Sequence, residues 1–167
     1  MRTHSTFIAL AGLTLAGCAA THGPGRSLPI EGDAITLETG PCFGRCPVYA
    51  VTVRPDGTGV FTGKRFTSVS GEKAFTLTRT QYDAFAARLA PYRPKAGEVR
   101  YAPGEPHCAH AATDLPSIDV TWTRAIGDRQ HLYFYFGCNM SGNQPMRDAL
   151  GNAADLLPID ALIGPRP

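Results

Sequence analysis

The segment "PVYAVTVRPDGTGVFTGKR" (residues 47–65) predicts the β-hairpin around which the rest of the fold is arranged. Its first half is rich in valine and tyrosine, which favour strands. Pro55, Asp56 and Gly57 then supply a fixed φ, a side chain that caps the turn, and a residue that tolerates a positive φ. The second half therefore returns beside the first as its antiparallel partner.

Further strands are expected on both sides of this hairpin. "AITLET" (residues 34–39) alternates apolar and polar residues, which is typical of a half-buried strand. A short strand is expected around residues 74–77. "SIDVTWTR" (117–124) and "QHLYFYFG" (130–137) show the same alternation, and the "IGD" between them predicts the turn of a second hairpin.

Two segments change to the period of a helix. In "LTRTQYDAFAARLAP" (residues 77–91) one stripe is apolar, Thr78 and Gln81 fit a capping box, and Pro91 ends the pattern. In "NQPMRDALGNAADLL" (143–157) Pro145 lies in the first turn of a second helix. The expected stripes are Tyr82, Phe85, Ala86 and Leu89 in the first, and Met146, Ala149, Leu150, Ala153 and Leu157 in the second.

This order of strands and helices predicts an α+β fold rather than repeated βαβ units. We expect a mostly antiparallel sheet of about five or six strands, with two helices packed on one face. Residues 91–117 show no periodicity and are predicted as a long loop. A loop of this length inside a domain is normally functional or fastened by other contacts.

The N-terminus predicts export and a lipid anchor. Arg2, an apolar run from Phe7 to Ala16 and the small residues that follow form a signal peptide, too short for a membrane-spanning helix. "LAGC", ending at Cys18, resembles the lipobox of bacterial lipoproteins, which implies that Cys18 is acylated after cleavage. The predicted organisation is a signal peptide (1–17), a lipidated cysteine with a flexible tether (18–32) and one domain (33–164).

The anchor and the charge together restrict the partners. Ala19 follows Cys18 where an aspartate would resemble an inner-membrane retention signal, so the expected location is the outer membrane, facing the periplasm. The expected partners are the lipid bilayer, through acylated Cys18, and a periplasmic protein or small ligand. With 16 Lys and Arg against 14 Asp and Glu the chain is nearly neutral, which does not favour nucleic acid.

Besides Cys18 the chain has four cysteines: Cys42, Cys46, Cys108 and Cys138. An even number of cysteines in an exported chain predicts disulfides, for which three pairings exist.

One long motif resembles a known bacterial family, the domain of unknown function family 6438. Members of that family have a Pro-Cys-x-Gly-x-Cys-Pro-x-Tyr segment that leads into a hairpin with an Asp-Gly turn. The resemblance covers roughly residues 33–157, including "ATDLPSIDVTWT" before the second hairpin. It implies the fold and export, and transfers no catalytic residues. The matching residues are Pro41, Cys42, Gly44, Cys46, Pro47, Tyr49, Asp56 and Gly57.

We predict that Cys42 pairs with Cys46, and Cys108 with Cys138. Gly44 lets the short loop between the first pair bend. Cys138 follows the last strand of the second hairpin, whose end lies beside the start of the strand near Ser117. A bridge from Cys138 to Cys108 would fasten the 91–117 segment.

A metal or redox role is the alternative for Cys42 and Cys46. Two thiolates with a histidine suit Cu(I), and His107 and His110 could add ligands. In copper-handling thioredoxin-like proteins, however, such a motif opens a helix, whose N-terminus lowers the thiol pKa. Here a strand follows, so a structural disulfide is favoured.

One surface is a candidate for partner binding. If Leu132, Phe134 and Phe136 face the helices, then His131, Tyr133 and Tyr135 project from the opposite face of the sheet. Tyrosine and histidine are amphipathic residues that are common at interfaces. The alternative is that the 91–117 segment covers these side chains.

The resulting hypothesis is a non-enzymatic lipoprotein domain that binds a partner or has a structural role, without cofactor or metal. The alternatives are a periplasmic thiolate metal carrier or redox protein using Cys42 and Cys46, and a hydrolase. The sequence has no G-x-S-x-G, phosphate-loop or HExxH motif that would favour an enzyme.

Overall fold

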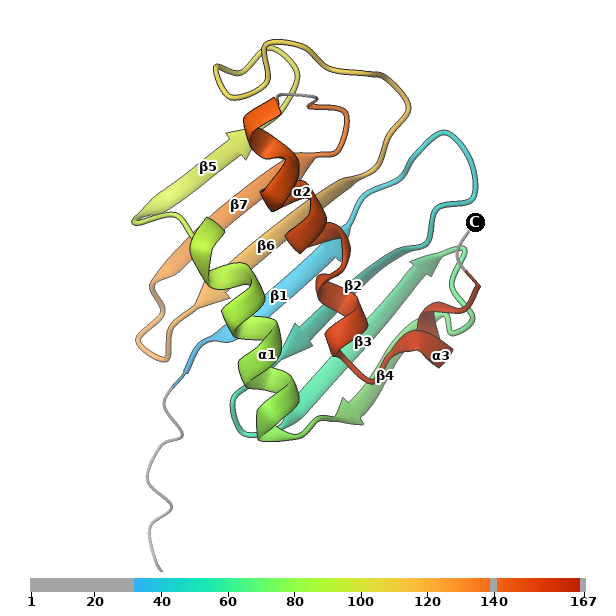
Figure 1. Cartoon of the computed structure of the whole chain (residues 1–167). Coiled ribbons are helices and arrows are strands. Elements are labelled where there is room, and N and C mark those ends of the chain that lie inside the picture. Colours follow the sequence, from blue (N-terminus) through green and yellow to red (C-terminus); the bar gives the residue numbers. More distant parts are fainter. Residues whose placement is uncertain (1–31, 139–140, 166–167) are drawn as a thin grey trace, which may run out of the picture.

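The computed structural model describes residues 32–138 and 141–165. In this part of the chain a seven-stranded sheet has the order β4-β3-β2-β1-β6-β7-β5 (Figure 1). The signal peptide, Cys18 and all but the last residue of the predicted tether lie outside the described residues. The strands are β1 (Ala34–Thr39), β2 (Val48–Val53), β3 (Thr58–Arg65), β4 (Gly71–Thr76), β5 (Gly97–Tyr101), β6 (Ser117–Thr123) and β7 (Arg129–Tyr135).

Both predicted hairpins form, and their turns share one geometry. In the first, the Gly57 amide donates to the carbonyl of Arg54 (3.1 Å), and the Arg54 amide donates to Thr58 (2.9 Å). The second hairpin repeats this pattern with Arg124, Gly127 and Asp128. Gly57 and Gly127 have φ values of 85° and 94°, a region that glycine enters at little cost. The glycines therefore fix the register of each strand pair.

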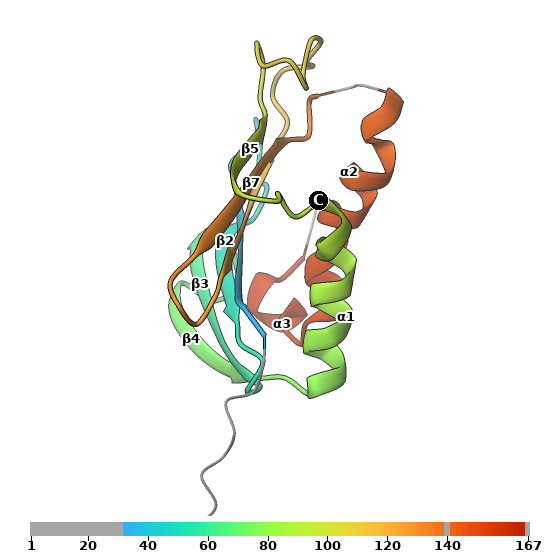
Figure 2. The same ribbon diagram turned by 90° about the vertical axis from the view of Figure 1, so that its left-hand side faces the viewer.

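In the described part of the chain, the helices cover one face of the sheet and leave the other face open (Figure 2). They are α1 (Arg79–Leu89), α2 (Gln144–Gly151) and α3 (Asp160–Ile163), with 3-10 turns η1 (Ala90–Tyr92), η2 (Ser141–Asn143) and η3 (Ala153–Leu156). Between sheet and helices lies the core, whose largest fully buried side chains include Trp122, Phe61, Phe85 and Phe134. The prediction of helices on one face of a sheet is thus confirmed.

Helix α1 begins as predicted, because its capping box is present. The Gln81 amide donates to the hydroxyl of Thr78 (3.2 Å), and the Gln81 side chain accepts from the Thr78 amide (2.9 Å). Tyr82, Phe85 and Leu89 form the buried stripe. The hydroxyl of Tyr82 donates to the carbonyl of Asp33 (2.8 Å), which fastens the start of the domain to this helix.

The predicted strand count was too low, and the sheet is mixed. Residues 91–117, predicted as a loop, contain β5, which pairs in parallel with β7 at one edge of the sheet. All other strand pairs are antiparallel. Strand β5 has only Val99 and Tyr101 directed toward the core, and both are only partly buried. Such an edge strand leaves little apolar periodicity in the sequence.

The predicted C-terminal helix is interrupted after Gly151. Asn152 leaves helical geometry with φ −104° and ψ 7°, and its side-chain amide donates to the carbonyl of Asp148 (3.0 Å). Asparagine competes for backbone hydrogen bonds in this way, which ends helices. The chain continues as η3 and α3, so that Ile159 and Ile163 also reach the core.

Candidate binding pocket

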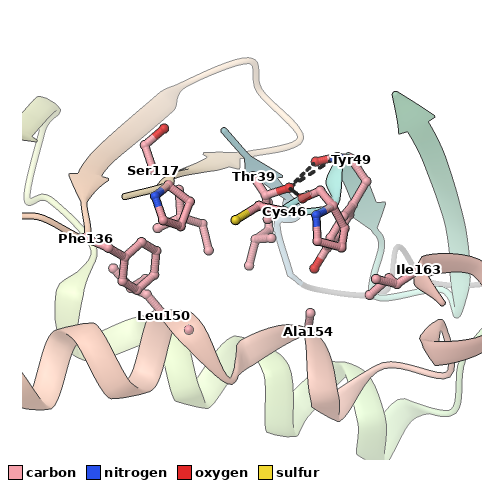
Figure 3. A pocket seen from close by; sticks show the side chains of 13 residues that line it. Thr39, Cys46, Tyr49, Ser117, Phe136, Leu150, Ala154 and Ile163 are labelled. Carbon is pink, nitrogen blue, oxygen red and sulfur yellow. Dashed lines mark hydrogen bonds between the residues drawn. The ribbon is translucent and has the colours of Figure 1, made fainter. Parts of the chain in front are cut away.

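An apolar pocket of about 280 Å³ lies between the sheet and the helices, at the Thr39 end of β1 (Figure 3). Its walls come from the loop before β2, the start of β6, the residue after β7, and the α2–η3 segment. The lining residues are Leu37, Thr39, Cys46, Pro47, Tyr49, Pro116, Ser117, Ile118, Phe136, Leu150, Gly151, Ala154 and Ile163. No residue of this lining is charged.

The exposure of the lining separates the bottom of the pocket from its mouth. Leu37, Tyr49, Ile118, Leu150, Ala154 and Ile163 are buried and form the bottom. The remaining lining residues are partly or fully exposed: Thr39, Cys46, Pro47, Pro116, Ser117, Phe136 and Gly151. The mouth therefore opens between the loop that carries Cys46 on one side and the C-terminal end of α2 on the other.

Thr39 positions the loop that forms one wall. Its hydroxyl donates to the carbonyl of Pro47 (2.9 Å) and accepts from the amide of Tyr49 (3.0 Å). The Gly40 amide donates to the carbonyl of Ser117 (2.8 Å). A Cβ at residue 40 would lie 2.1 Å from the Ser117 hydroxyl oxygen, so a larger residue would require that hydroxyl to rotate away. These hydrogen bonds hold the wall against β2 and β6.

The Cys42–Cys46 disulfide closes this loop, with Cα atoms 5.8 Å apart. Between the two cysteines Phe43 projects into solvent with 87% of its surface exposed. The Phe43 amide donates to the carbonyl of Asp114 (3.1 Å), which ties the loop to the segment before β6. This pair is the one predicted, and the disulfide stiffens the wall beside the pocket mouth.

A cationic and aromatic cluster lies next to the same loop. The guanidinium carbons of Arg45 and Arg65 are 5.6 and 5.1 Å from the centroid of the Phe66 ring, within cation–π range. Phe66 has a φ of 55°, which is rare for a bulky residue, and is 42% exposed. The residues after it contact α3, because the Ser68 amide donates to the carbonyl of Ile163 (3.0 Å).

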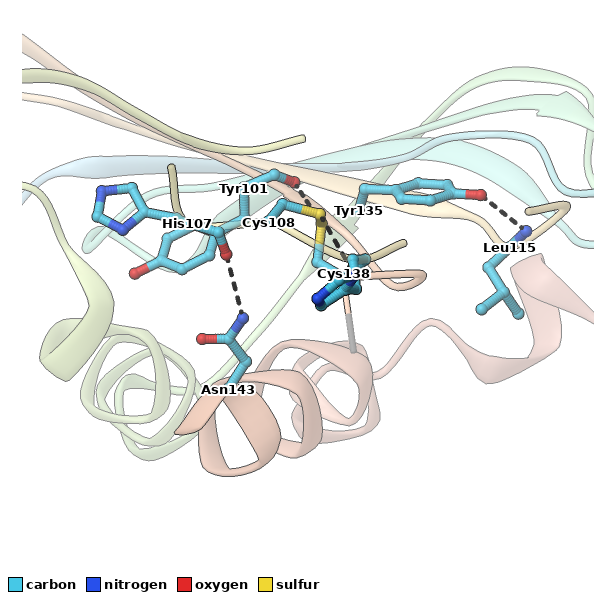
Figure 4. Close-up of a disulfide and its surroundings, with 8 residues drawn as sticks. Tyr101, His107, Cys108, Leu115, Tyr135, Cys138 and Asn143 are labelled. Atoms are coloured by element: carbon cyan, nitrogen blue, oxygen red, sulfur yellow. Dashed lines mark hydrogen bonds between the residues drawn. A yellow bond between two sulfur atoms is a disulfide. The ribbon is translucent and has the colours of Figure 1, made fainter. Parts of the chain in front are cut away.

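The Cys108–Cys138 disulfide, also the predicted pair, fastens the 91–117 segment (Figure 4). Both cysteines are buried, and Cys138 Sγ lies 3.3 Å from the carbonyl oxygen of Tyr101 at the end of β5. The ring of His107 packs on that of Tyr101 at 4.9 Å, and Asn143 donates to the His107 carbonyl. His107 thus packs against Tyr101 and Asn143, and these contacts are not with the Cys42–Cys46 loop.

The predicted surface residues His131, Tyr133 and Tyr135 lie on the open face of β7, each only partly exposed. His131 Nε2 is 2.8 Å from an Asp119 oxygen, and Nδ1 is 3.6 Å from a Glu98 oxygen. A hydrogen bond from Arg100 is the main cause that holds the pKa of Glu98 below its usual value. The face carries a connected network of polar and charged side chains.

The 91–117 segment reaches this face in two places. Strand β5 extends the sheet beside β7, and the Arg100 guanidinium lies 4.5 Å from the centroid of the Tyr133 ring. The Leu115 amide donates to the hydroxyl of Tyr135 (3.3 Å). The segment therefore contacts both tyrosines, and their rings are partly covered.

Two further observations concern metal sites and the membrane. In residues 32–138 and 141–165 no group of three His, Cys, Asp or Glu side chains is placed to hold a metal ion. A thiolate site would need Cys42 and Cys46 in reduced form, whereas here they are joined. None of the described helices is long and apolar enough to cross a membrane.

Residues 33–156 match the family described as Domain of unknown function (DUF6438). The chain belongs to this family. The match confirms the resemblance seen at the cysteine motif, and its range contains every strand and helices α1 and α2. No curated protein and no solved structure matches the chain significantly.

The pocket was not among the sequence-based predictions. One usable signal was present: Gly151 and Ala154 are small residues beside the apolar stripe of this segment. Small residues on a helix face leave space wherever the facing side chains do not fill it. Whether they do depends on the packing of β1, β6 and Phe136, which the sequence pattern does not encode.

Proposed function

We propose that this chain is a non-catalytic periplasmic lipoprotein, held at the outer membrane through Cys18, whose domain binds a small apolar ligand. The observation that carries the proposal is the preformed pocket of about 280 Å³ with an uncharged lining. Ligand sites are usually concave, mostly apolar and largely formed before binding, with a few polar groups at their edges. Here those groups are the hydroxyls of Thr39 and Ser117.

The position of the pocket supports delivery of the ligand from the periplasm. The described chain starts beside Ala34, whereas the pocket is at Thr39, the other end of β1. Six strand residues at about 3.3 Å each separate the two ends by roughly 17–20 Å. A domain tethered through Cys18 would enter its sheet at one end and offer the pocket at the opposite end.

The test uses 1-decanol as a neutral apolar probe and methyl NMR as the readout. We expect decanol to shift the methyl signals of Leu150, Ala154 and Ile163, which lie at the bottom of the pocket. Methyl groups on the open face, such as that of Ala74 on β4, should not respond. If these bottom methyls do not shift at saturating probe, the proposal is wrong.

A blocking variant makes the test specific. A Cβ at Gly151 would meet only Phe136 ring carbons, at 3.5 and 3.8 Å, which is ordinary contact. Gly151→Leu should therefore close the mouth and abolish decanol binding, while the melting temperature stays equal or rises, because glycine disfavours helices. The matched control is Gly142→Leu, where an added Cβ has nothing within 4 Å. That variant should bind decanol as the native protein does.

A further inference from the structure

We infer that the ligand is a single-chain anionic amphiphile, with its chain in the pocket and its carboxylate held between Arg45 and Arg147. This inference rests on the proposed binding function and names the ligand class. It depends on three features: the size of the pocket, Arg45 in the loop that forms one wall, and Arg147 on α2, the helix that contributes to the other wall.

The size of the pocket sets the length of the chain. An apolar cavity of ~150 Å³ in a protein holds one benzene molecule. A volume of about 280 Å³ therefore accepts roughly ten to twelve carbon atoms. Its lining is uncharged and its bottom is made of side chains such as Leu37, Leu150 and Ile163, which suit an alkyl chain.

Arg45 is next to Cys46, which lines the mouth, and lies inside the disulfide-closed loop. The disulfide therefore restrains its backbone, while its side chain is exposed. The guanidinium contacts the Phe66 ring and forms no salt bridge with any residue in the described part of the chain. It remains able to bind an anion at the mouth.

Arg147 lies on α2, which supplies Leu150 and Gly151 to the facing wall. It precedes Leu150 by three residues and Gly151 by four, so it lies on the pocket-facing stripe of α2, one turn earlier. The side chain is half-exposed, and among the described residues it has no salt bridge or hydrogen bond. An arginine fork binds a carboxylate through two parallel hydrogen bonds.

Two acidic side chains close by in sequence form hydrogen bonds with neutral groups, and neither forms a salt bridge with Arg45 or Arg147 among the described residues. Asp148, next to Arg147, accepts a hydrogen bond from the side chain of Gln144 (2.8 Å). Asp114, near the tip of the loop, accepts from the hydroxyl of Thr113 (2.9 Å). Two arginines without a salt bridge in the described part of the chain thus lie on the two segments that form the mouth of the apolar pocket. Cations at such a mouth complement an amphiphile with a negative head.

The experiment compares three probes with the same chain and different heads: decanoate, 1-decanol and decyltrimethylammonium, each below its micelle concentration. Calorimetry on the mature domain should give the tightest binding for decanoate and the weakest for the cation. Arg45→Gln and Arg147→Gln should each weaken decanoate binding about two- to fivefold, the range of an exposed ion pair, and leave decanol binding unchanged.

The controls are Arg65→Gln and Arg88→Gln. Arg65 contacts the same Phe66 ring as Arg45 but has no neighbour in sequence that lines the pocket. Arg88 is an exposed arginine on α1. Neither substitution should change decanoate binding. Equal affinity for decanoate and decanol, unaffected by Arg45→Gln and Arg147→Gln, would overturn the inference and leave the binding function intact. Failure of all three probes would overturn the binding function itself.

Discussion

Asp56 shows how one side chain sets the central hairpin. Its carboxylate accepts from the amide and the hydroxyl of Thr58, at 2.9 and 2.7 Å. These hydrogen bonds favour the charged form and hold the pKa of Asp56 below its usual value of 3.8. Because the folded pKa is depressed, the stability that Asp56 contributes is present above about pH 4 and is lost as pH falls through the folded pKa.

We therefore predict that Thr58→Val raises the pKa of Asp56 toward 3.8, because the hydroxyl hydrogen bond is the largest cause of the shift. Carboxyl chemical shifts followed through an NMR pH titration measure this directly. Glu72, an exposed carboxylate on β4, is the internal reference. An unchanged pKa of Asp56 in Thr58→Val would contradict this explanation of the turn.

At the scale of elements, the two disulfides contribute different amounts to the stability of the fold. On the chain-entropy relation, closing the short Cys42–Cys46 loop contributes about 2 kcal/mol, and closing the 30-residue separation of Cys108 and Cys138 about 3.5 kcal/mol. The second bridge is also buried and holds the segment that contains β5. It should be the stronger constraint on the fold.

The prediction is that the Cys108→Ala, Cys138→Ala double variant loses more free energy of unfolding than the Cys42→Ala, Cys46→Ala double variant. Urea denaturation of both measures the difference. The second variant should also bind decanol more weakly, since its loop forms a wall of the pocket. Equal destabilisation by the two pairs of substitutions would contradict the larger stabilising contribution given to the Cys108–Cys138 disulfide.

Element prediction succeeded where a residue pattern reports a local cause. The capping box of α1 and the Asp-Gly turn of the first hairpin are made by neighbours in sequence, so Thr78, Gln81, Asp56 and Gly57 sufficed. It failed for β5, whose place is decided by parallel pairing to β7, about 33 residues later along the chain. It also failed at Asn152, where a side chain ends a stripe that otherwise continues.

At the scale of the whole molecule, the predicted acylation of Cys18 would place the pocket at the outer membrane. We predict that Cys18→Ser abolishes acylation and leaves the protein unprocessed or soluble. Membrane fractionation with mass determination of the N-terminus checks this. The matched control is Ser27→Ala, a polar change within the predicted tether. A cleaved Cys18→Ser protein that still sediments with the outer membrane would disprove the lipobox interpretation.

By itself the sequence determined the fold class, the two hairpins, the first helix, the family and the cysteine pairing. Each of these follows from residues that are near in sequence, or from a motif such as Pro-Cys-x-Gly-x-Cys-Pro. Only the tertiary structure decided the seventh strand, the parallel edge and the pocket. A cavity is the space that side chains from β1, β6, α2 and η3 leave unfilled. That space depends on how distant elements pack, because close packing is a property of the assembled core and not of any one segment.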